Sequence, residues 1–131
     1  MARTPREVTD AELAVLEVLW VSGRRTAREL AETLYPDEGR SQVPTVQKLC
    51  ERLEIKGFVS RDRRVRPHEF EAALDRGEVI ERQLRAVADK LCEGSLTPLL
   101  TQLVRGSTLK ASQRRQLRRI LDDLDREDRG R

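Results

Sequence analysis

The chain has 131 residues, of which 37% are charged and 37% hydrophobic, and its formal net charge is +3. This length suits one ordinary domain, or one small domain with an appendage that needs a partner, and argues against two full globular domains. No run approaches the roughly 18 apolar residues of a membrane span, and the first residues lead into a charged helix. We therefore expect a cytoplasmic protein with no membrane insertion.

The positive charge is concentrated in the middle of the chain. Residues 1–39 hold five Lys or Arg and eight Asp or Glu, whereas residues 40–66 hold eight and three, a local net charge of +5. A solvated face and a phosphate-binding surface would both produce such a cluster. The order of the predicted elements helps to choose between them.

Two capping boxes predict the first two helices. Residues 9–12 (TDAE) place Thr at the cap and Glu three positions on, and the apolar residues that follow at helical spacing end at Gly23. Residues 26–29 (TARE) repeat the pattern. This second helix must end before Pro36, because the residue before a proline avoids the helical region.

A third helix is predicted after a polar turn over residues 36–40. We expect Ser41 to cap it, Pro44 to lie in its first turn and Gly57 to end it. One apolar face points inward, and the polar side chains on the other face are of types that contact base edges and phosphates. The inward residues are Val46, Leu49, Cys50 and Leu53; the expected DNA contacts are Gln42, Val43, Thr45, Gln47, Lys48 and Arg52, with Lys56 further along.

The pattern changes period after Gly57 and predicts a strand, a basic turn and a return strand that ends near Ala72. A short helix, a tight connection, a basic helix and such a hairpin are the parts of a winged helix-turn-helix reader, although a solvated charged face remains the alternative. In that fold the hairpin arginines would reach phosphates or the minor groove. They are Arg61, Arg63, Arg64 and Arg66, whereas we expect His68 to be an ordinary polar strand residue.

Several short motifs occur in order between residues 7 and 66. They are Thr9-Asp10-Ala11-Glu12-Leu13, Leu19-Trp20, Gly23, Thr26-Ala27-Arg28-Glu29-Leu30, Thr45-Val46, the segment from Leu49 to Leu53, and Lys56-Gly57. Together they resemble the N-terminal signature of the BlaI/MecI penicillinase-repressor family. The resemblance implies a dimeric winged-helix repressor that binds a palindromic operator, and residues 91–96 are similar to the start of the family's dimerisation segment.

Two departures from the family pattern concern the DNA-binding residues. Lys48 stands where the family often has a second Thr, and residues 65–68 (VRPH) replace a Gly-Arg-aromatic wing. The operator sequence and the wing contacts therefore cannot be transferred from the family. The resemblance also suggests, as a further partner, a membrane-bound sensor metalloprotease that cuts near the junction of reader and tail.

Three short amphipathic helices are predicted beyond residue 74. They run from Arg76 to Cys92, with Gly94 as a stop, from Leu96 to Val104, and along a final leucine-rich stripe. We expect their apolar stripes to form a dimer interface, the alternative being a helical bundle packed on the chain's own wing domain. The interface residues would be Val79, Ile80, Leu84, Val87, Leu91, Leu96, Leu99, Leu100, Leu103, Leu117, Ile120, Leu121 and Leu124.

No catalytic constellation is visible. The chain has one histidine, two distant cysteines (Cys50 and Cys92) that we expect to be structural, and no glycine-rich phosphate loop, so no enzyme, cofactor or metal site is predicted. The sequence predicts a mainly α fold with a small β-hairpin wing: a winged helix-turn-helix over residues 1–73 and a helical dimerisation domain over residues 74–131. Its function would be DNA-binding transcriptional repression, the alternative being a winged-helix protein-interaction module that does not bind DNA.

Overall fold

The computed structural model describes residues 7–106 and 109–130. The chain divides into two compact units, Met1–Val87 and Ala88–Arg131. The first unit therefore extends past the predicted boundary between residues 73 and 74. Within the residues described, no helix is both long enough and apolar enough to cross a membrane.

Helices α1 (Asp10–Ser22) and α2 (Ala27–Leu34) begin at the two predicted capping boxes. The Thr9 hydroxyl accepts a hydrogen bond from the Glu12 backbone N–H at 3.1 Å, and the Glu12 carboxylate accepts one from the Thr9 N–H at 2.9 Å. α2 starts with the same reciprocal pair of bonds. These bonds satisfy backbone donors that a helix N-terminus leaves without partners, which confirms both predicted starts.

The third helix begins differently from the prediction. A 3₁₀ turn, η1 (Gly39–Gln42), runs directly into α3 (Val43–Lys56), so the residue at the cap is Gln42. The prediction that Ser41 caps the helix is wrong, because the Ser41 hydroxyl instead donates to the Glu38 carbonyl oxygen at 3.0 Å within the turn. The predicted end of the helix at Gly57 is confirmed.

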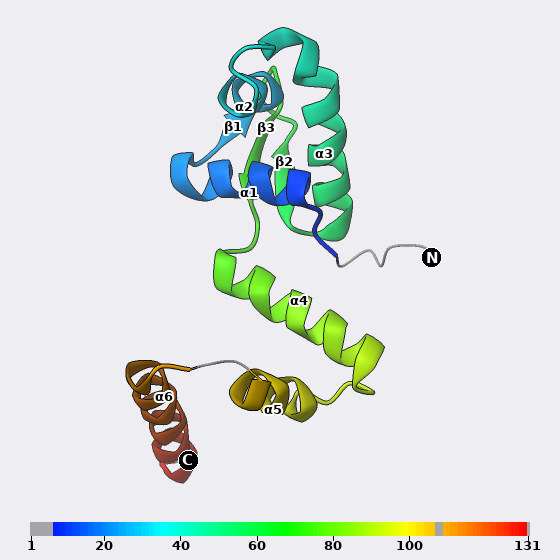
Figure 1. Ribbon diagram of the computed structural model, residues 1–131. Coiled ribbons are helices and arrows are strands. Elements are labelled where there is room, and N and C mark those ends of the chain that lie inside the picture. Colours follow the sequence, from blue (N-terminus) through cyan, green and yellow to red (C-terminus); the bar gives the residue numbers. More distant parts are fainter. Residues whose placement is uncertain (1–6, 107–108, 131) are drawn as a thin grey trace. The chain divides into compact units, whose positions relative to one another are not determined.

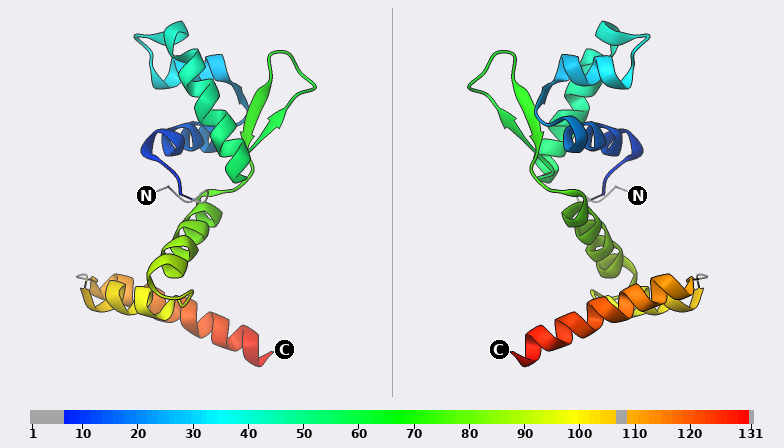
Figure 2. Two further views of the ribbon diagram at one scale, coloured as in Figure 1. Left: turned by 90° about the vertical axis from the view of Figure 1, so that its right-hand side faces the viewer. Right: turned by 90° about the vertical axis from the view of Figure 1, so that its left-hand side faces the viewer.

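A small antiparallel sheet completes the first unit. Strands β2 (Val59–Asp62) and β3 (Glu69–Ala72) form the predicted hairpin, which stands beside α3 in Figure 2. A third strand, β1 (Arg25–Thr26), pairs with the other edge of β3 and gives the order β1-β3-β2. Two residues are too short for any alternating pattern, so the sequence could not predict β1. Arg61 lies within β2 opposite Phe70, not in the turn as predicted.

The core of the first unit is built from α1, α2, α3, the hairpin and the start of α4 (Arg76–Leu91) (Figure 1). All four α3 residues predicted to point inward are buried. The largest buried side chains of this core are Leu16, Leu30, Leu53, Phe58 and Phe70. Burial raises the pKa of the Cys50 thiol to about 12, so this cysteine is protonated and packs as a small apolar residue.

The first half of α4 is held against the first unit. The Trp20 indole N–H donates to the Leu74 carbonyl oxygen at 2.8 Å, and the Arg76 guanidinium lies 4.6 Å from the centre of the Trp20 ring. Val79 is 5% exposed and belongs to the core. Its assignment to a dimer interface is therefore corrected: Val79 faces the chain's own core and offers almost no surface to a partner.

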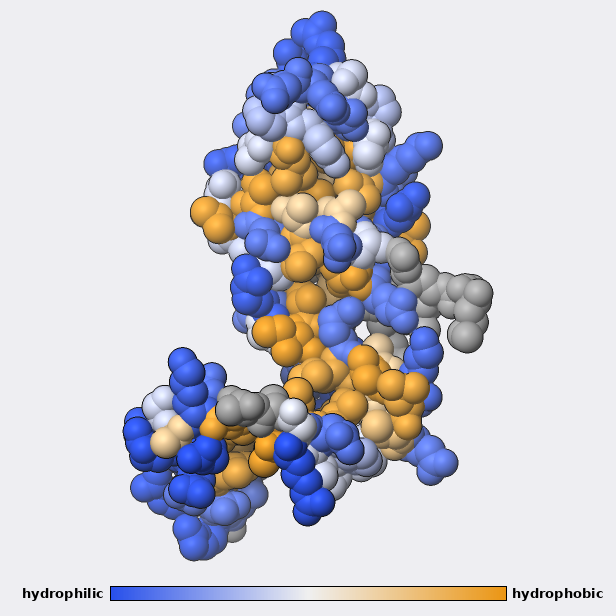
Figure 3. Space-filling model, in the orientation of Figure 1, coloured by the Kyte–Doolittle hydropathy of each residue, from blue (hydrophilic) through white to orange (hydrophobic). Residues whose placement is uncertain are grey.

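The second unit contains the end of α4 together with α5 (Thr97–Gly106) and α6 (Ala111–Arg129). The three helices predicted for the tail are thus present. In Figure 3 apolar residues lie uncovered along α4 on the face in view. The mainly α fold with a small hairpin wing, predicted from the sequence, is confirmed.

A buried ion pair joins the start of α1 to the end of α3. The Lys56 ammonium donates to both Glu12 carboxylate oxygens at 2.7 and 2.9 Å and to the Glu7 carbonyl oxygen at 2.8 Å. The Glu12 side chain is fully buried and that of Lys56 is 13% exposed. The prediction that Lys56 projects outward beside the DNA-contacting residues is wrong, because all three of its donors are used inside the unit.

Replacing Lys56 should cost far more stability than replacing an exposed cation. In Lys56→Met the Glu12 carboxylate stays buried without its partner, so we expect the free energy of unfolding to fall by about 3 kcal/mol. Adding Glu12→Gln, which keeps the capping box, should restore more than half of the loss. Urea titrations followed by the fluorescence of Trp20, the chain's one tryptophan, report on this unit. The control Glu32→Gln removes only the exposed pair with Arg28 and should change little.

The same pair makes stability depend on pH in the acid range. Burial alone would raise the pKa of Glu12, but hydrogen bonds from Lys56 and the Thr9 backbone outweigh it and leave the pKa below its ordinary value of 4.5. A lowered pKa stabilises the fold above pH 4.5, and this contribution is lost as the pH falls through the folded-state value. The stability gap between wild type and Glu12→Gln should therefore be constant near neutral pH and shrink below pH 4.5. A gap that widens on acidification would contradict the assignment.

Candidate nucleic-acid interface

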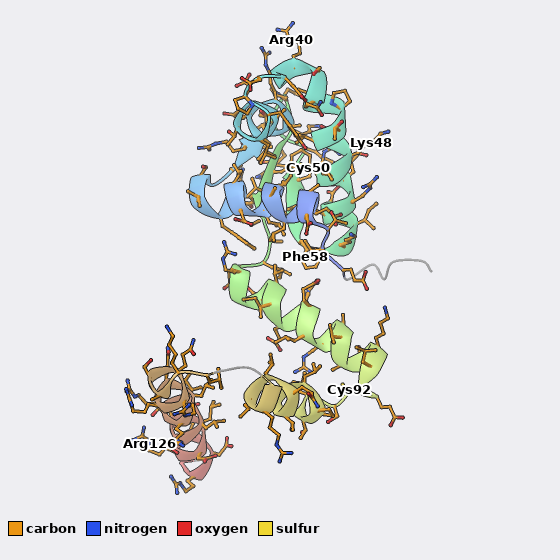
Figure 4. All side chains as sticks on the ribbon, in the orientation of Figure 1. Arg40, Lys48, Cys50, Phe58, Cys92 and Arg126 are labelled. Atoms are coloured by element: carbon orange, nitrogen blue, oxygen red, sulfur yellow. The ribbon has the colours of Figure 1, made fainter. Side chains whose placement is uncertain are left out.

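The outer face of α3 carries exposed cations and polar side chains. Thr45, Lys48 and Arg52 are exposed, as is Arg40 in the preceding turn. In Figure 4 Arg40 and Lys48 point away from the body of the unit, whereas Cys50 points inward. Among the residues that the structure describes, none of these three cations has a carboxylate partner within ion-pair distance. Their charge is thus available to an anionic ligand.

Three other residues predicted to contact DNA lie partly buried. The Gln42 amide donates to the Glu38 carboxylate, which ties it to the turn. Val43 and Gln47 lie on the side of α3 that faces the wing and line a groove there. The predicted contacts therefore fall on two surfaces, the outer face of α3 and the groove between α3 and the hairpin.

Two of the four wing arginines are neutralised within the unit. Arg63 makes a bidentate pair with Glu54 of α3, with nitrogen–oxygen distances of 2.8 and 3.0 Å. Arg64 pairs with Asp62 at 3.1 Å, and its hydrogen bonds lower the pKa of that carboxyl to about 2. Other N–H donors of both guanidinium groups stay exposed, but a carboxylate already offsets the charge of each arginine.

The other two wing arginines meet a histidine instead of a carboxylate. The Arg61 Nε–H donates to His68 Nδ1 at 2.9 Å, and Arg66 Nη1 lies 3.0 Å from His68 Nε2. Arg61 also lies over the Phe70 ring, 5.2 Å from its centre. In the described part of the chain, neither arginine has an ion pair with a carboxylate.

These side chains border a groove of about 300 Å³ between the reader and the wing. α2 contributes Ala27 and Arg28 with the cap residue Thr26, α3 contributes Val43 and Gln47, and the wing contributes Arg61, Arg66, Pro67 and His68. Sequence patterns did not single out Arg28, because only the packing of α2 brings it near the wing. Arg40 was also missed, although its place in the +5 segment was a usable signal.

Most residues predicted for the dimer interface are exposed on the single chain. Leu96 and Leu99 are half-buried. The exposed residues, with 40–72% of their surface accessible, are Ile80, Leu84, Val87, Leu91, Leu100, Leu103, Leu117, Ile120, Leu121 and Leu124. An apolar groove of about 340 Å³ lies between α5 and α6, and Val104 and Leu109 line it beside four of these residues.

Over residues 7–106 and 109–130, no cluster of three or more His, Cys, Asp or Glu is arranged for metal binding. Cys50 is buried, and Cys92 is half-buried.

Comparison with known proteins agrees with the motifs noted in the sequence. The family model described as penicillinase repressor matches residues 8–123, which covers both units. One relative, 27% identical over 121 residues, is the "Uncharacterized 16.5 kDa protein in ptsI 3'region" of Latilactobacillus sakei; the match covers 92% of this chain and 82% of the relative. With its winged fold and this match over most of its length, the chain belongs to the penicillinase repressor family, a family of transcriptional regulators.

Proposed function

We propose that the protein is a DNA-binding repressor that occupies a palindromic operator as a dimer, with α3 of each subunit in a major groove. The observation that carries the proposal is the set of cations, on one helix and the adjoining wing, that have no carboxylate partner among the residues the structure describes. Arg40, Lys48 and Arg52 lie on or beside α3, and Arg61 and Arg66 lie on the hairpin. Such a distribution fits a helix in the groove flanked by phosphate contacts.

We assign the recognition of base edges to the exposed N-terminal half of α3. Thr45 can place its methyl group against a thymine methyl, and Lys48 can donate to guanine. Gln47, which lines the groove beside the wing, could reach an adenine edge only from that side. We therefore assign selection among bases chiefly to Thr45 and Lys48, with Gln47 next.

We assign dimerisation to the exposed apolar surface of the tail helices. Exposed apolar surface of this extent is typical of an interface, and the groove between α5 and α6 is lined almost wholly by apolar side chains. One winged unit contacts a single half-site, whereas two linked units reach sites about one helical turn apart, and the second docking is then intramolecular. Affinity for the operator should therefore depend on the tail.

Repression by this protein would be competitive. A dimer that covers a promoter-overlapping operator excludes the polymerase, and it needs no catalytic group or cofactor. We place the protein in the cytoplasm, where its DNA is. By analogy with the family, release would follow cleavage by a membrane-bound sensor metalloprotease near the junction of the reader and the tail, since cleavage there would lower dimerisation.

Substitutions on α3 and on the wing should affect DNA binding in different ways. Thr45→Ala or Lys48→Ala should cost about 1–3 kcal/mol on the duplex from upstream of the protein's own gene and less on random DNA, as expected for base contacts. Arg66→Ala should weaken both duplexes alike, because phosphates carry no sequence. Fluorescence anisotropy on both duplexes measures the two losses, with Arg105→Ala in α5 as a control.

If the α3 variants weakened both duplexes equally, α3 would not be the reader. If the wild type bound neither duplex, a protein-interaction module would replace the repressor proposal. The exposed Ile55 on α3, 83% accessible, is the feature that would then suit a protein partner.

Charged substitutions in the tail should separate the subunits. Leu121→Glu or Leu100→Glu places a charge in an apolar contact, so we expect a folded monomer with far weaker operator binding. Sedimentation and a binding titration on the same samples measure both effects. Val21→Glu is the matched control, since Val21 is 87% exposed on the first unit and should leave the dimer intact. A monomeric variant with full operator affinity would contradict the coupling, and a monomeric wild type at micromolar concentration would remove the interface.

A further inference from the structure

The single histidine of the chain lies between two arginines at the groove beside the wing. The Arg61 Nε–H donates to His68 Nδ1, so Nδ1 is the acceptor of the ring and Nε2 carries its proton. Arg66 Nη1, also a donor, lies only 3.0 Å from Nε2. A neutral imidazole has one acceptor nitrogen, and therefore one of the two arginines faces a donor instead of an acceptor.

This mismatch involves two of the four wing arginines, Arg61 and Arg66. Arg63 and Arg64 face Glu54 and Asp62, so each already has a carboxylate partner within the unit. Among the residues described by the structure, Arg61 and Arg66 have no ion pair with a carboxylate. An anion placed at His68 would accept from both arginines without displacing any ion pair.

We propose that Arg61, Arg66 and His68 form a binding site for one backbone phosphate of DNA, and that His68 takes up a proton when the phosphate binds. The inference rests on the proposed DNA-binding function and extends it to a residue that sequence patterns did not assign. A phosphodiester offers acceptor oxygens only, which suits three donor groups. The groove of about 300 Å³ beside them opens between α3 and the wing, the side on which DNA would lie.

Proton uptake follows from the charges that surround the ring. In the free protein, burial and then Arg61, Arg66 and Arg63 lower the pKa of His68, with Asp62 opposing them. Arg28 from α2 also lines the groove, whereas α3 contributes only the uncharged Val43 and Gln47 there. A bound phosphate would reverse the sign of the local field and stabilise the imidazolium, whose two N–H groups need acceptors.

Proton uptake on binding makes the affinity for DNA depend on pH. Because the complex holds a proton that the free protein lacks, affinity rises as the pH falls between the bound-state and free-state pKa values of His68. We expect the affinity for a random-sequence duplex to rise about fivefold or more from pH 8 to pH 6, within the limit of tenfold per pH unit for one proton. Glu12 and Lys56 keep the fold intact over this range, since the pKa of Glu12 lies below 4.5.

A direct test uses the ring resonances of the one histidine in the untagged full-length protein. Titrated by NMR without DNA, His68 should show a pKa below the ordinary value of about 6.5, and with a random-sequence duplex a pKa above it. Binding titrations at pH 6 and pH 8 supply the second measurement. His68→Gln should bring the affinity ratio between the two pH values close to one, whereas Arg105→Gln, which removes a cation of α5, should keep the wild-type ratio.

The outcomes separate this inference from the function on which it rests. If the ratio of affinities at pH 6 and pH 8 is the same for the wild type and His68→Gln, and the pKa of His68 does not change on binding, the phosphate-binding site is refuted and the repressor proposal stands. If no duplex binds at any pH, both the repressor proposal and the proposed phosphate-binding site are refuted. The NMR measurement needs no variant, so a folding defect in His68→Gln would not affect the result.

Discussion

The position of α3 depends on the ion pair between Glu12 and Lys56. Glu12 caps α1 and accepts the Lys56 ammonium, so one carboxylate fixes both the start of α1 and the end of α3. Immediately after Lys56, Gly57 adopts a φ of 85°, a left-handed conformation that favours glycine, and the chain turns into β2. A helix held at its C-terminal end by a buried, fully hydrogen-bonded cation can present its N-terminal half outward as a rigid surface. The wing begins just after Gly57 with β2, so its position beside α3 depends on the same ion pair.

Charge on α3 and the wing is divided between groups paired within the unit and groups that have no carboxylate partner among the described residues. Arg63 fastens the wing to α3 through Glu54, and Arg64 stiffens the hairpin turn through Asp62. Lys48 and Arg52 on α3 have no such partners in the described residues, nor has Arg66 on the wing. Net charge alone does not distinguish these roles. Packing decides which arginines shape the surface and which are left for a ligand.

Features whose sequence signals are local were predicted correctly, whereas features that depend on contacts formed by folding were not. Capping boxes, the proline after a helix end and the inward stripe of α3 are local signals, and they predicted α1, α2 and the buried face of α3 correctly. Lys56 was misplaced because its partner lies 44 positions away, and Val79 because α4 turns one face toward the core of the first unit. β1 also depends on a distant partner, strand β3, whereas the meeting of His68 with Arg61 and Arg66 depends on the local geometry of the hairpin. The candidate DNA contacts on α3 were predictable as residue types, but their division between the outer face and the wing groove was not.

The internal ion pairs of the wing have a consequence for ionic strength. An arginine that is free in solution is not neutralised by its own protein, and its contact with a phosphate releases a counterion from DNA, which makes binding weaken steeply as salt is added. When Arg63 or Arg64 contacts a phosphate, the Glu54 or Asp62 carboxylate paired with it also lies near the DNA backbone and offsets part of its charge. These two arginines should therefore add little to the salt dependence of binding. The slope of affinity against salt concentration should reflect the cations without internal partners, a smaller number than the basic residues of the segment would suggest.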